Sequence, residues 1–306
     1  MSCPLERPAN AATWAWQPLQ LTGARMAKID EILHDYSIME EIGRGARSLV
    51  YKVERKSDGA RLAAKFVAVS EPSDLGIIRH LENEHSVLGK LHRHPVPVTS
   101  LIVRPVEFRK ARRLFRTKAA CHIMEFAPGR TLAEYREHPL ALALRVFIKV
   151  CDAMDYVHSV GYIHADLKPN NIMVDGDAQV KLIDFGFALP VGTKLRGLKG
   201  TWGYLAPEQT GGRLNAKTDV FNLGAVMYWT FTGRNLPSIM PDEGEGIGGF
   251  VPRKFTYPPP SVLAPELPQG LSDLVLRCLS HKTRRRPTMI EVRADLNNLI
   301  QRLPLI

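Results

Sequence analysis

The sequence predicts an α+β protein built from two unequal lobes. Strand-like segments crowd into the first third of the chain, whereas apolar residues at helical spacing dominate the remainder. The two parts join near residues 126–130, where Pro128 and Gly129 interrupt the pattern. With 306 residues, 45% of them hydrophobic and 24% charged, the chain is long enough for two packed lobes. A cleft between such lobes is a favoured position for a ligand site.

Residues 1–35 are predicted to be an N-terminal extension that precedes the two lobes. They are mixed in composition, and a short helical pattern at residues 26–36 follows the first, proline-containing part. We expect that first part to be mobile. Trp14 and Trp16 are expected to pack onto the body of the domain, with docking on a partner as the alternative.

Three strands are predicted between Tyr36 and Val69, where the apolar pattern changes its period. Turns are expected at residues 43–48 and at residues 56–59, and the second of these contains an Asp-Gly hairpin signal. A helix is predicted to follow, at about residues 75–91.

Two more strands are predicted around Val103–Phe108 and Ala120–Glu125, with a strongly basic loop between them. The basic run is expected to be the solvated face of a hairpin; the alternative is a patch that binds phosphate or acidic groups. Its cations are Arg104, Arg109, Lys110, Arg112, Arg113, Arg116 and Lys118.

The rest of the chain is predicted to be mainly helical. Apolar residues recur at a period near 3.6 from Leu140 to Val160, and Thr288 with Glu291 gives a capping-box signal for the last helix. Residues 233–270 are rich in Pro and Gly and are expected to be irregular. The other predicted helices are residues 218–232 and 271–279.

The charge and the cysteines restrict the possible partners and compartment. A formal charge of +10 is compatible with a basic protein, an acidic partner, nucleic acid or a membrane surface. We expect the first of these, with no nucleic-acid partner. None of the four cysteines has the short spacing of a zinc or redox motif, and we expect them to be reduced. No signal-peptide core and no run of ~18 apolar residues is present, so we expect a cytoplasmic protein without a membrane span.

One stretch, residues 162–186, carries most of the chemistry. Asp166 lies close to Lys168 in a predicted loop, and Asn171 and Asp184 lie at the two ends of a short predicted hairpin. Mg²⁺ binds carboxylate and amide oxygens and usually keeps part of its coordination shell for phosphate. The stretch therefore predicts one base or positioning carboxylate, one phosphate-facing cation and two metal ligands.

This stretch resembles the catalytic loop and metal-binding segment of the protein kinase family, H-R-D-x-K-x-x-N followed by D-F-G. Ala165 stands where the family usually has Arg. The resemblance covers residues 36–303 and implies the two-lobed protein kinase fold. In that fold a small β-rich N-lobe (36–125) and a larger helical C-lobe (131–303) are joined by a hinge (126–130).

The resemblance places the phosphates of ATP under a glycine-rich loop that contains Gly43 and Gly45. Small residues let backbone N–H groups approach phosphate oxygens, although such glycine pairs are common in hairpins. Ser48 replaces the third glycine of the family's loop. The implied nucleotide-binding residues of this region are Ile42, Gly43, Arg44, Gly45, Ala46, Arg47, Ser48, Leu49 and Val50.

Lys65 corresponds to the family's phosphate-pairing lysine. Because a buried, unpaired ammonium is costly, Lys65 needs an acidic partner. Glu84 is the expected partner and Glu82 the competitor, since the residues that follow Glu84 match the family's helix. The residues implied to line the adenine pocket are Met124, Glu125 and Ala127.

The resemblance also implies a division of roles within the catalytic stretch. Asp166 would orient the substrate hydroxyl or accept its proton, and Lys168 would offset charge on the transferred phosphoryl group. Asn171 and Asp184 would hold Mg²⁺, so that catalysis is mostly positioning and electrostatics. His164 is expected to be a buried structural residue.

Residues 200–208, GTWGYLAPE, resemble the family's substrate-docking segment. Thr201 is expected to hydrogen-bond near the catalytic aspartate and lysine, which favours Ser and Thr over Tyr as substrates. Glu208 is expected to pair with Arg286, and Asp219 to cap the backbone of the catalytic loop. The family usually has Trp and Ser where this chain has Phe221 and Asn222.

Ala165 bears on regulation. In many relatives the Arg at this position pairs with a phosphate on the segment between Asp184 and Glu208. Thr193, Thr201 and Tyr204 are the hydroxyl residues of that segment. We therefore expect an activity that does not depend on phosphorylation of this segment.

The sequence thus predicts a protein serine/threonine kinase that uses ATP and Mg²⁺ on protein substrates. The alternative is a pseudokinase or ATP-binding scaffold with the same fold, for which Ser48 and Ala165 are the motif-level signs. A small-molecule phosphotransferase is a third possibility, against which the GTWGYLAPE segment and Arg286 stand. A nucleic-acid-binding role inferred from charge alone ranks last.

Overall fold

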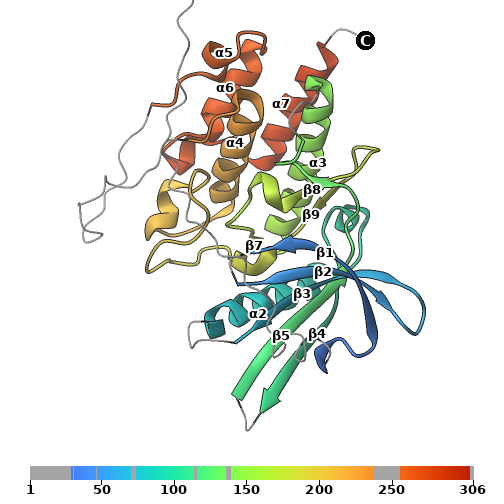
Figure 1. The fold of residues 1–306 in the computed structure, drawn as a ribbon. Helices are drawn as coiled ribbons and strands as arrows, with labels where there is room; N and C mark the ends of the chain where they lie inside the picture. The colour runs from blue at the N-terminus through green and yellow to red at the C-terminus, as the bar shows by residue number, and fades with distance from the viewer. Residues whose placement is uncertain are drawn as a thin grey trace, which may run out of the picture.

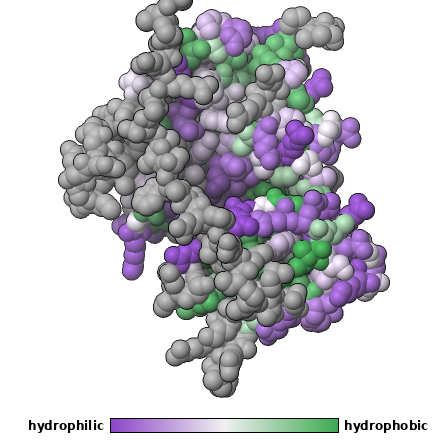
Figure 2. Space-filling view, in the orientation of Figure 1, coloured by the Kyte–Doolittle hydropathy of each residue, from purple (hydrophilic) through white to green (hydrophobic). Residues whose placement is uncertain are grey.

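The chain folds into two lobes, one built on an antiparallel sheet and the other on helices (Figure 1). This computed structural model describes residues 29–303, apart from residues 30, 46, 70–73, 114–115, 136–138 and 237–255. The α+β, two-lobed architecture predicted from the sequence is confirmed. The described surface visible in Figure 2 carries hydrophilic side chains over both lobes, with hydrophobic ones in smaller groups between them.

The N-lobe contains a five-stranded sheet in the order β1-β2-β3-β5-β4, covered on one face by helix α2 (Figure 1). β3 forms because its residues are almost all small or apolar, and it is buried between β2 and β5. α2 presents Val87, Leu88 and Leu91 to the core that it shares with the C-lobe. The bounds are β1 Tyr36–Arg44, β2 Leu49–Arg55, β3 Arg61–Ala68, α2 Asp74–Leu91, β4 Pro105–Arg113 and β5 Arg116–Glu125.

The predicted hairpin is present, but its strands are longer than predicted and replace most of the expected loop. The strands pair from Pro105 to Arg113 and from Arg116 to Glu125, so most of the cations lie on strands. β4 is an edge strand, and an edge tolerates charged side chains whose long stems lie along the sheet. Arg109 is partly buried there, and it pairs with Asp35 at 2.9 Å and with Glu107 at 2.7 Å.

The packed N-lobe begins upstream of the boundary predicted at residue 36. Ile29, Ile32 and Leu33 are buried in the same cluster as Tyr36 and the inner residues of the sheet. Their i, i+3, i+4 spacing makes one apolar stripe of a helical turn. The predicted mobility of the first residues and the predicted packing of Trp14 and Trp16 lie outside the described residues.

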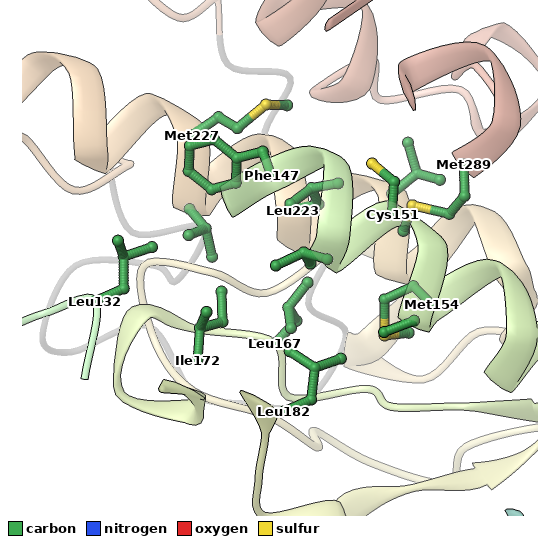
Figure 3. Close-up of a cluster of buried hydrophobic side chains, with 14 of the residues drawn as sticks. Leu132, Phe147, Cys151, Met154, Leu167, Ile172, Leu182, Leu223, Met227 and Met289 are labelled. Atoms are coloured by element: carbon green, nitrogen blue, oxygen red, sulfur yellow. The ribbon is translucent and has the colours of Figure 1, made fainter. Parts of the chain in front are cut away.

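The C-lobe is a set of helices around a hydrophobic core (Figure 3). α4 has buried residues all round its first three turns, whereas α7 begins with the predicted capping box. There the hydroxyl of Thr288 accepts from the N–H of Glu291 at 3.2 Å. The bounds are α3 Leu140–Ser159, α4 Ala216–Thr232, α5 Pro260–Leu263, α6 Gln269–Cys278 and α7 Met289–Gln301. The predicted helices are confirmed, but α5 and the start of α6 interrupt the stretch predicted to be irregular at residues 233–270.

Short strand pairs on the C-lobe carry the catalytic stretch. Leu167 and the hairpin residues Ile172 and Leu182 point towards Phe147 and Met154 of α3 (Figure 3). The catalytic loop is thereby anchored on the core. The bounds are β6 Arg130–Thr131, β7 Tyr162–Ile163, β8 Ile172–Val174, β9 Val180–Leu182 and β10 Leu189–Pro190.

Arg286 ties the segment after the catalytic stretch to the late helices, as predicted. Its side chain is fully buried, and it forms a two-pronged ion pair with Glu208 at 2.6 and 2.9 Å. It also donates to the carbonyls of Ser280 at 2.7 Å and Lys217 at 2.9 Å. The guanidinium lies 4.9 Å from the centre of the Phe221 ring.

Replacing Arg286 with Met is expected to lower the free energy of unfolding by about 3–5 kcal/mol, because Glu208 then loses the cation that compensates its burial. Arg285→Met is the matched control, since Arg285 is exposed, and it should change that free energy by less than about 0.5 kcal/mol. Urea unfolding followed by circular dichroism measures both. Equal losses in the two variants would contradict the structural role of the ion pair.

Candidate active site

A cavity of about 730 Å³ lies between the lobes. Its volume falls within the range typical of sites for small organic ligands and cofactors. Most of the predicted nucleotide-binding residues and both predicted metal ligands line it: Ile42, Gly43, Arg44, Gly45, Ser48, Val50, Lys65, Glu84, Met124, Glu125, Ala127, Asn171 and Asp184. The structure therefore brings together, at one cleft, residues predicted from five separate segments.

Two of the predicted residues do not reach this cavity, and a third cannot be placed. Arg47 and Leu49 line a separate small hollow with Phe66. Leu49 pairs with Phe66 across the strands, whereas Val50 pairs with Lys65, and successive residues of a strand face opposite sides of a sheet. Ala46 lies outside the described residues.

Lys65 lies at the centre of the cleft and joins three elements. Its Nζ donates to Glu84 Oε2 on α2 at 3.1 Å and to Asp184 Oδ1 at 2.9 Å. Glu84 is 1% exposed. The competitor Glu82 instead pairs with Lys110 on β4. The pairing of Lys65 with Glu84 is therefore confirmed.

These charges determine each other's protonation. Burial by itself would raise the pKa of Asp184, but the Lys65 ammonium opposes it and lowers that pKa to about 2. Burial would lower the pKa of Lys65, yet the carboxylates of Asp184 and Glu84 hold it above its usual value. At neutral pH the cleft thus holds an ionised Asp184, the charge state in which a carboxylate can bind a cation.

The catalytic loop forms a compact polar triangle. Asp166 is 3% exposed; its Oδ1 accepts from the Thr201 hydroxyl at 2.6 Å and its Oδ2 lies 2.9 Å from Lys168 Nζ. Lys168 Nζ in turn donates to the Thr201 hydroxyl at 3.0 Å. The predicted contact of Thr201 with both residues is confirmed, and it joins the docking segment to the loop.

Asn171 and Asp184 lie at the two ends of the β8–β9 hairpin. Asn171 Nδ2 donates to the carbonyl of Asp166 at 2.9 Å, and this bond leaves the amide oxygen available as a ligand. Among the described residues, no group of three His, Cys, Asp or Glu side chains suits a metal ion. A carboxylate with one amide oxygen fits Mg²⁺ that completes its shell with phosphate and water.

The side chain of Asp219, on α4, hydrogen-bonds to the backbone of the catalytic loop, as predicted. Its carboxylate accepts from the N–H of His164 at 2.9 Å and of Ala165 at 2.8 Å, and it lies 2.8 Å from His158 Nε2. Ala165 has a φ of 60°, a left-handed conformation that costs a side-chain-bearing residue roughly 1–2 kcal/mol. The bonds to Asp219 stabilise the strained loop. His164 is fully buried, with its ring 4.6 Å from that of Phe185.

Gln209 was missed by the sequence reasoning, and Asn222 was noted only as a departure from the family's motif. Gln209 is fully buried, and its Nε2 donates to the carbonyls of Ala165 at 2.7 Å and Lys199 at 2.8 Å. Its Oε1 accepts from Asn222 Nδ2 at 2.8 Å, and the same Nδ2 donates to the Tyr204 carbonyl at 2.6 Å. The departure at Asn222 therefore contributes to the support of the loop. The only sequence signal for Gln209 was an amide residue directly after Pro207 and Glu208.

Helix α2 also holds the segment that follows Asp184. Asn83 Nδ2 donates to the carbonyls of Gly186 at 3.2 Å and Ala188 at 2.9 Å. His80 Nδ1 lies 3.2 Å from the Gly186 carbonyl, and its ring stacks at 4.8 Å on Phe187. The helix that supplies Glu84 thus also fixes the backbone that follows Asp184.

At Ala165 the structure forms an apolar cluster. Ala165 packs with Ile163 and Leu214, all buried, and the partly buried Leu189 and Leu195 cover them. A methyl group in this surrounding is well packed, whereas a charged side chain would need a new partner.

Comparison with known proteins agrees with this geometry. The family model for the protein kinase domain matches residues 36–296. The chain is 31% identical over 280 residues to the "Probable serine/threonine-protein kinase PknB" of Lactococcus lactis, an alignment that covers 87% of this chain and 42% of that protein. It is 33% identical to "Sperm motility kinase 2B" of Mus musculus (84% of this chain, 50% of that protein) and 30% to "Serine/threonine-protein kinase Pkn1" of Myxococcus xanthus (87% and 38%).

The chain spans half or less of the length of these relatives. In the part that the structure describes, each helix is too short or too polar to cross a lipid bilayer.

The match to the family begins at β1 and ends within α7, so it includes both lobes and every residue of the cleft described above. The salt-bridged Lys65, the Asp166 triangle and the Glu208–Arg286 pair occupy the positions that the motifs predicted. The chain therefore belongs to the protein kinase family.

Proposed function

We propose that this protein is an active serine/threonine kinase that transfers the γ-phosphoryl group of ATP to Ser or Thr hydroxyls of protein substrates. The observation that carries the proposal is the position of Lys65 Nζ between Glu84 and Asp184. This contact unites the N-lobe lysine, helix α2 and a metal-binding carboxylate in one arrangement. A scaffold without activity would not require the lysine, helix α2 and the carboxylate to lie in contact.

Each polar residue of the cleft has a task in the proposed transfer. Lys65 binds phosphate oxygens of the nucleotide, and Asp166 orients the acceptor hydroxyl and takes its proton. Lys168 offsets charge on the transferred group. Bound Mg²⁺, held by Asn171 and Asp184, would neutralise charge on the phosphates. The adenine pocket is assigned to Met124, Glu125 and Ala127 together with the glycine-rich loop; these assignments remain predictions.

The acceptor is proposed to be Ser or Thr because Thr201 contacts both Asp166 and Lys168. This hydroxyl brings the docking segment close to the acceptor position, where a short side chain reaches Asp166. A protein substrate is favoured over a small molecule because the Glu208–Arg286 pair anchors the segment that would receive a peptide.

The two departures from the family's motifs are compatible with activity. Ser48 closes the loop turn, where its carbonyl accepts from the N–H of Gly45 at 2.9 Å. It is a small polar residue at the rim of the cavity, which stays open. Ala165 bears on regulation, because its side chain packs away from the cleft in the apolar cluster.

A transfer assay tests the proposed activity. The purified protein, labelled ATP, Mg²⁺ and a general protein acceptor should yield a labelled acceptor, and Asp166→Asn should lower the rate by ~100-fold or more, as loss of a catalytic base does. Chelation of Mg²⁺ should stop transfer by the unaltered protein. Equal labelling by both proteins, or none by either, would support the scaffold alternative.

The pairing of Lys65 is tested by two adjacent substitutions on α2. Glu84→Gln should reduce kcat/KM for ATP by about 10- to 100-fold, the loss expected for a charged hydrogen bond. Glu82→Gln is the matched control, since Glu82 pairs with Lys110 outside the cleft, and should change kcat/KM by less than about threefold. Similar losses in both variants would show that α2 is disturbed in general.

We also propose that activity does not require phosphorylation of residues 184–208. Support comes from the apolar cluster at Ala165 and from Thr193, whose hydroxyl donates to the carbonyl of Pro190 at 2.7 Å. The segment is also fixed by the pairing of β10 with β7.

Thr193→Ala should therefore keep its kcat within about twofold of the unaltered protein, since one exposed hydroxyl bond contributes little. The measurement is initial-rate transfer after phosphatase treatment of both proteins. An inactive Thr193→Ala protein, with activity restored in Thr193→Glu, would refute independence from phosphorylation.

A cytoplasmic location is proposed as well. Among the described residues, Cys121, Cys151 and Cys278 are free thiols buried in the core. Burial raises the pKa of Cys278 to about 12, which keeps this thiol protonated and unreactive. Reduced, buried cysteines are typical of proteins in a reducing compartment.

A further inference from the structure

His122 on β5 is a fully buried histidine, and neither of its ring nitrogens has a hydrogen-bond partner. It pairs in register with Lys65 on β3, so the two side chains leave the same face of the sheet. Buried polar atoms without partners are rare and costly in folded proteins. Such an atom beside the central lysine of the cleft requires an explanation.

The ring is enclosed on every side by residues of the N-lobe. Lys65 on β3 and Phe108 on β4 flank it in register, and α2 places Glu84 and His85 over it. The His85 ring meets the His122 ring edge-on at 5.1 Å and lies 5.7 Å from Phe108. The titratable and charged groups that face His122 are thus those of Lys65, Glu84 and His85.

The carboxylate of Glu84 lies close to the ring and can accept a hydrogen bond. His122 Nδ1 lies 3.7 Å from Glu84 Oε2, the oxygen that also accepts from Lys65 Nζ at 3.1 Å. This distance exceeds a hydrogen bond by a few tenths of an ångström, and polar contacts in empty active sites often shorten when ligand binds. A small movement of α2 towards the sheet would complete the bond.

We infer that His122 is a positioning residue for the proposed phosphoryl transfer: its Nδ1–H bonds to Glu84 and keeps the carboxylate turned towards Lys65. His122 does not line the cavity, whereas Lys65 and Glu84 do, so it acts through Glu84 and touches no nucleotide. The inference rests on the proposed kinase function.

The charge balance at Glu84 agrees with a second donor. Burial by itself would raise the pKa of Glu84. The Lys65 ammonium opposes this most strongly and His122 also lowers the pKa, so that the net shift is downward.

The position of α2 has a further consequence, because Asn83 next to Glu84 holds the carbonyls of Gly186 and Ala188. The position of α2 that brings Glu84 to Lys65 is therefore also the position that holds the backbone after Asp184.

Two substitutions of nearly equal shape separate the bond from the packing. Leu and Asn both branch at the γ carbon, but Asn can place an N–H where His122 has Nδ1, and Leu cannot. His85→Leu is the control, since it removes the neighbouring imidazole and leaves the pair of His122 and Glu84 intact. The measurements are KM for ATP, kcat, the dissociation constant of a non-hydrolysable ATP analogue with Mg²⁺, and the melting temperature.

His122→Leu should raise both KM for ATP and the analogue's dissociation constant by about three- to tenfold, the effect of one hydrogen bond. Its melting temperature should stay equal or increase, because an unpaired buried polar group is lost. His122→Asn should return both constants to within about twofold of the unaltered protein, and His85→Leu should leave them there.

The inference is overturned if His122→Leu binds the analogue as tightly as the unaltered protein, or if Asn is as impaired as Leu. Analogue binding needs no transfer, so it also separates this inference from the proposed activity. An unaltered protein that binds the analogue but transfers no phosphate would refute the activity alone, while weaker binding by the Leu variant would still support the role of His122.

Discussion

The contact on which the rest of the cleft depends is the ammonium of Lys65 between two carboxylates. Glu84 belongs to α2 of the N-lobe, and Asp184 follows the β8–β9 hairpin that is anchored on the C-lobe. Without the cation the two acids would repel each other in a surrounding of low polarity. Lys65 therefore joins α2 to the segment that follows the hairpin, and it also lowers the pKa of Asp184.

The catalytic loop is supported by buried hydrogen bonds to its backbone. Asp219 of α4 and Gln209 accept from or donate to the backbone of the catalytic loop, and both are fully buried. Removing one partner of a buried hydrogen bond of this kind costs much, because the other is left unpaired away from water. The structure thus combines an ion pair across the cleft with buried hydrogen bonds to the backbone of the loop that carries Asp166.

Residues whose chemistry follows from a short local pattern could be predicted from the sequence. The spacing of Asp166 and Lys168, the capping box at Thr288 and the helical periodicity of α3 are examples. Gln209 and His122 could not be predicted, because their partners are distant in the chain and the residue types occur in many roles. The length of the β4–β5 hairpin was missed for another reason: a run of cations suggests a loop unless the strand is known to be an edge.

Gly129 has a consequence for how the two lobes can move. Its φ is +100°, and a Cβ there would lie 2.2 Å from the carbonyl oxygen of Val174. The next residue, Arg130, pairs with Val174, and the N–H of Leu132 donates to the carbonyl of Ile172 at 2.8 Å. The connection is thus clamped to the C-lobe from Gly129 onward, so the pivot for any opening of the cleft is confined to the few residues before it. Any such opening would also separate Lys65 of β3 from Asp184, because their hydrogen bond of 2.9 Å spans the cleft.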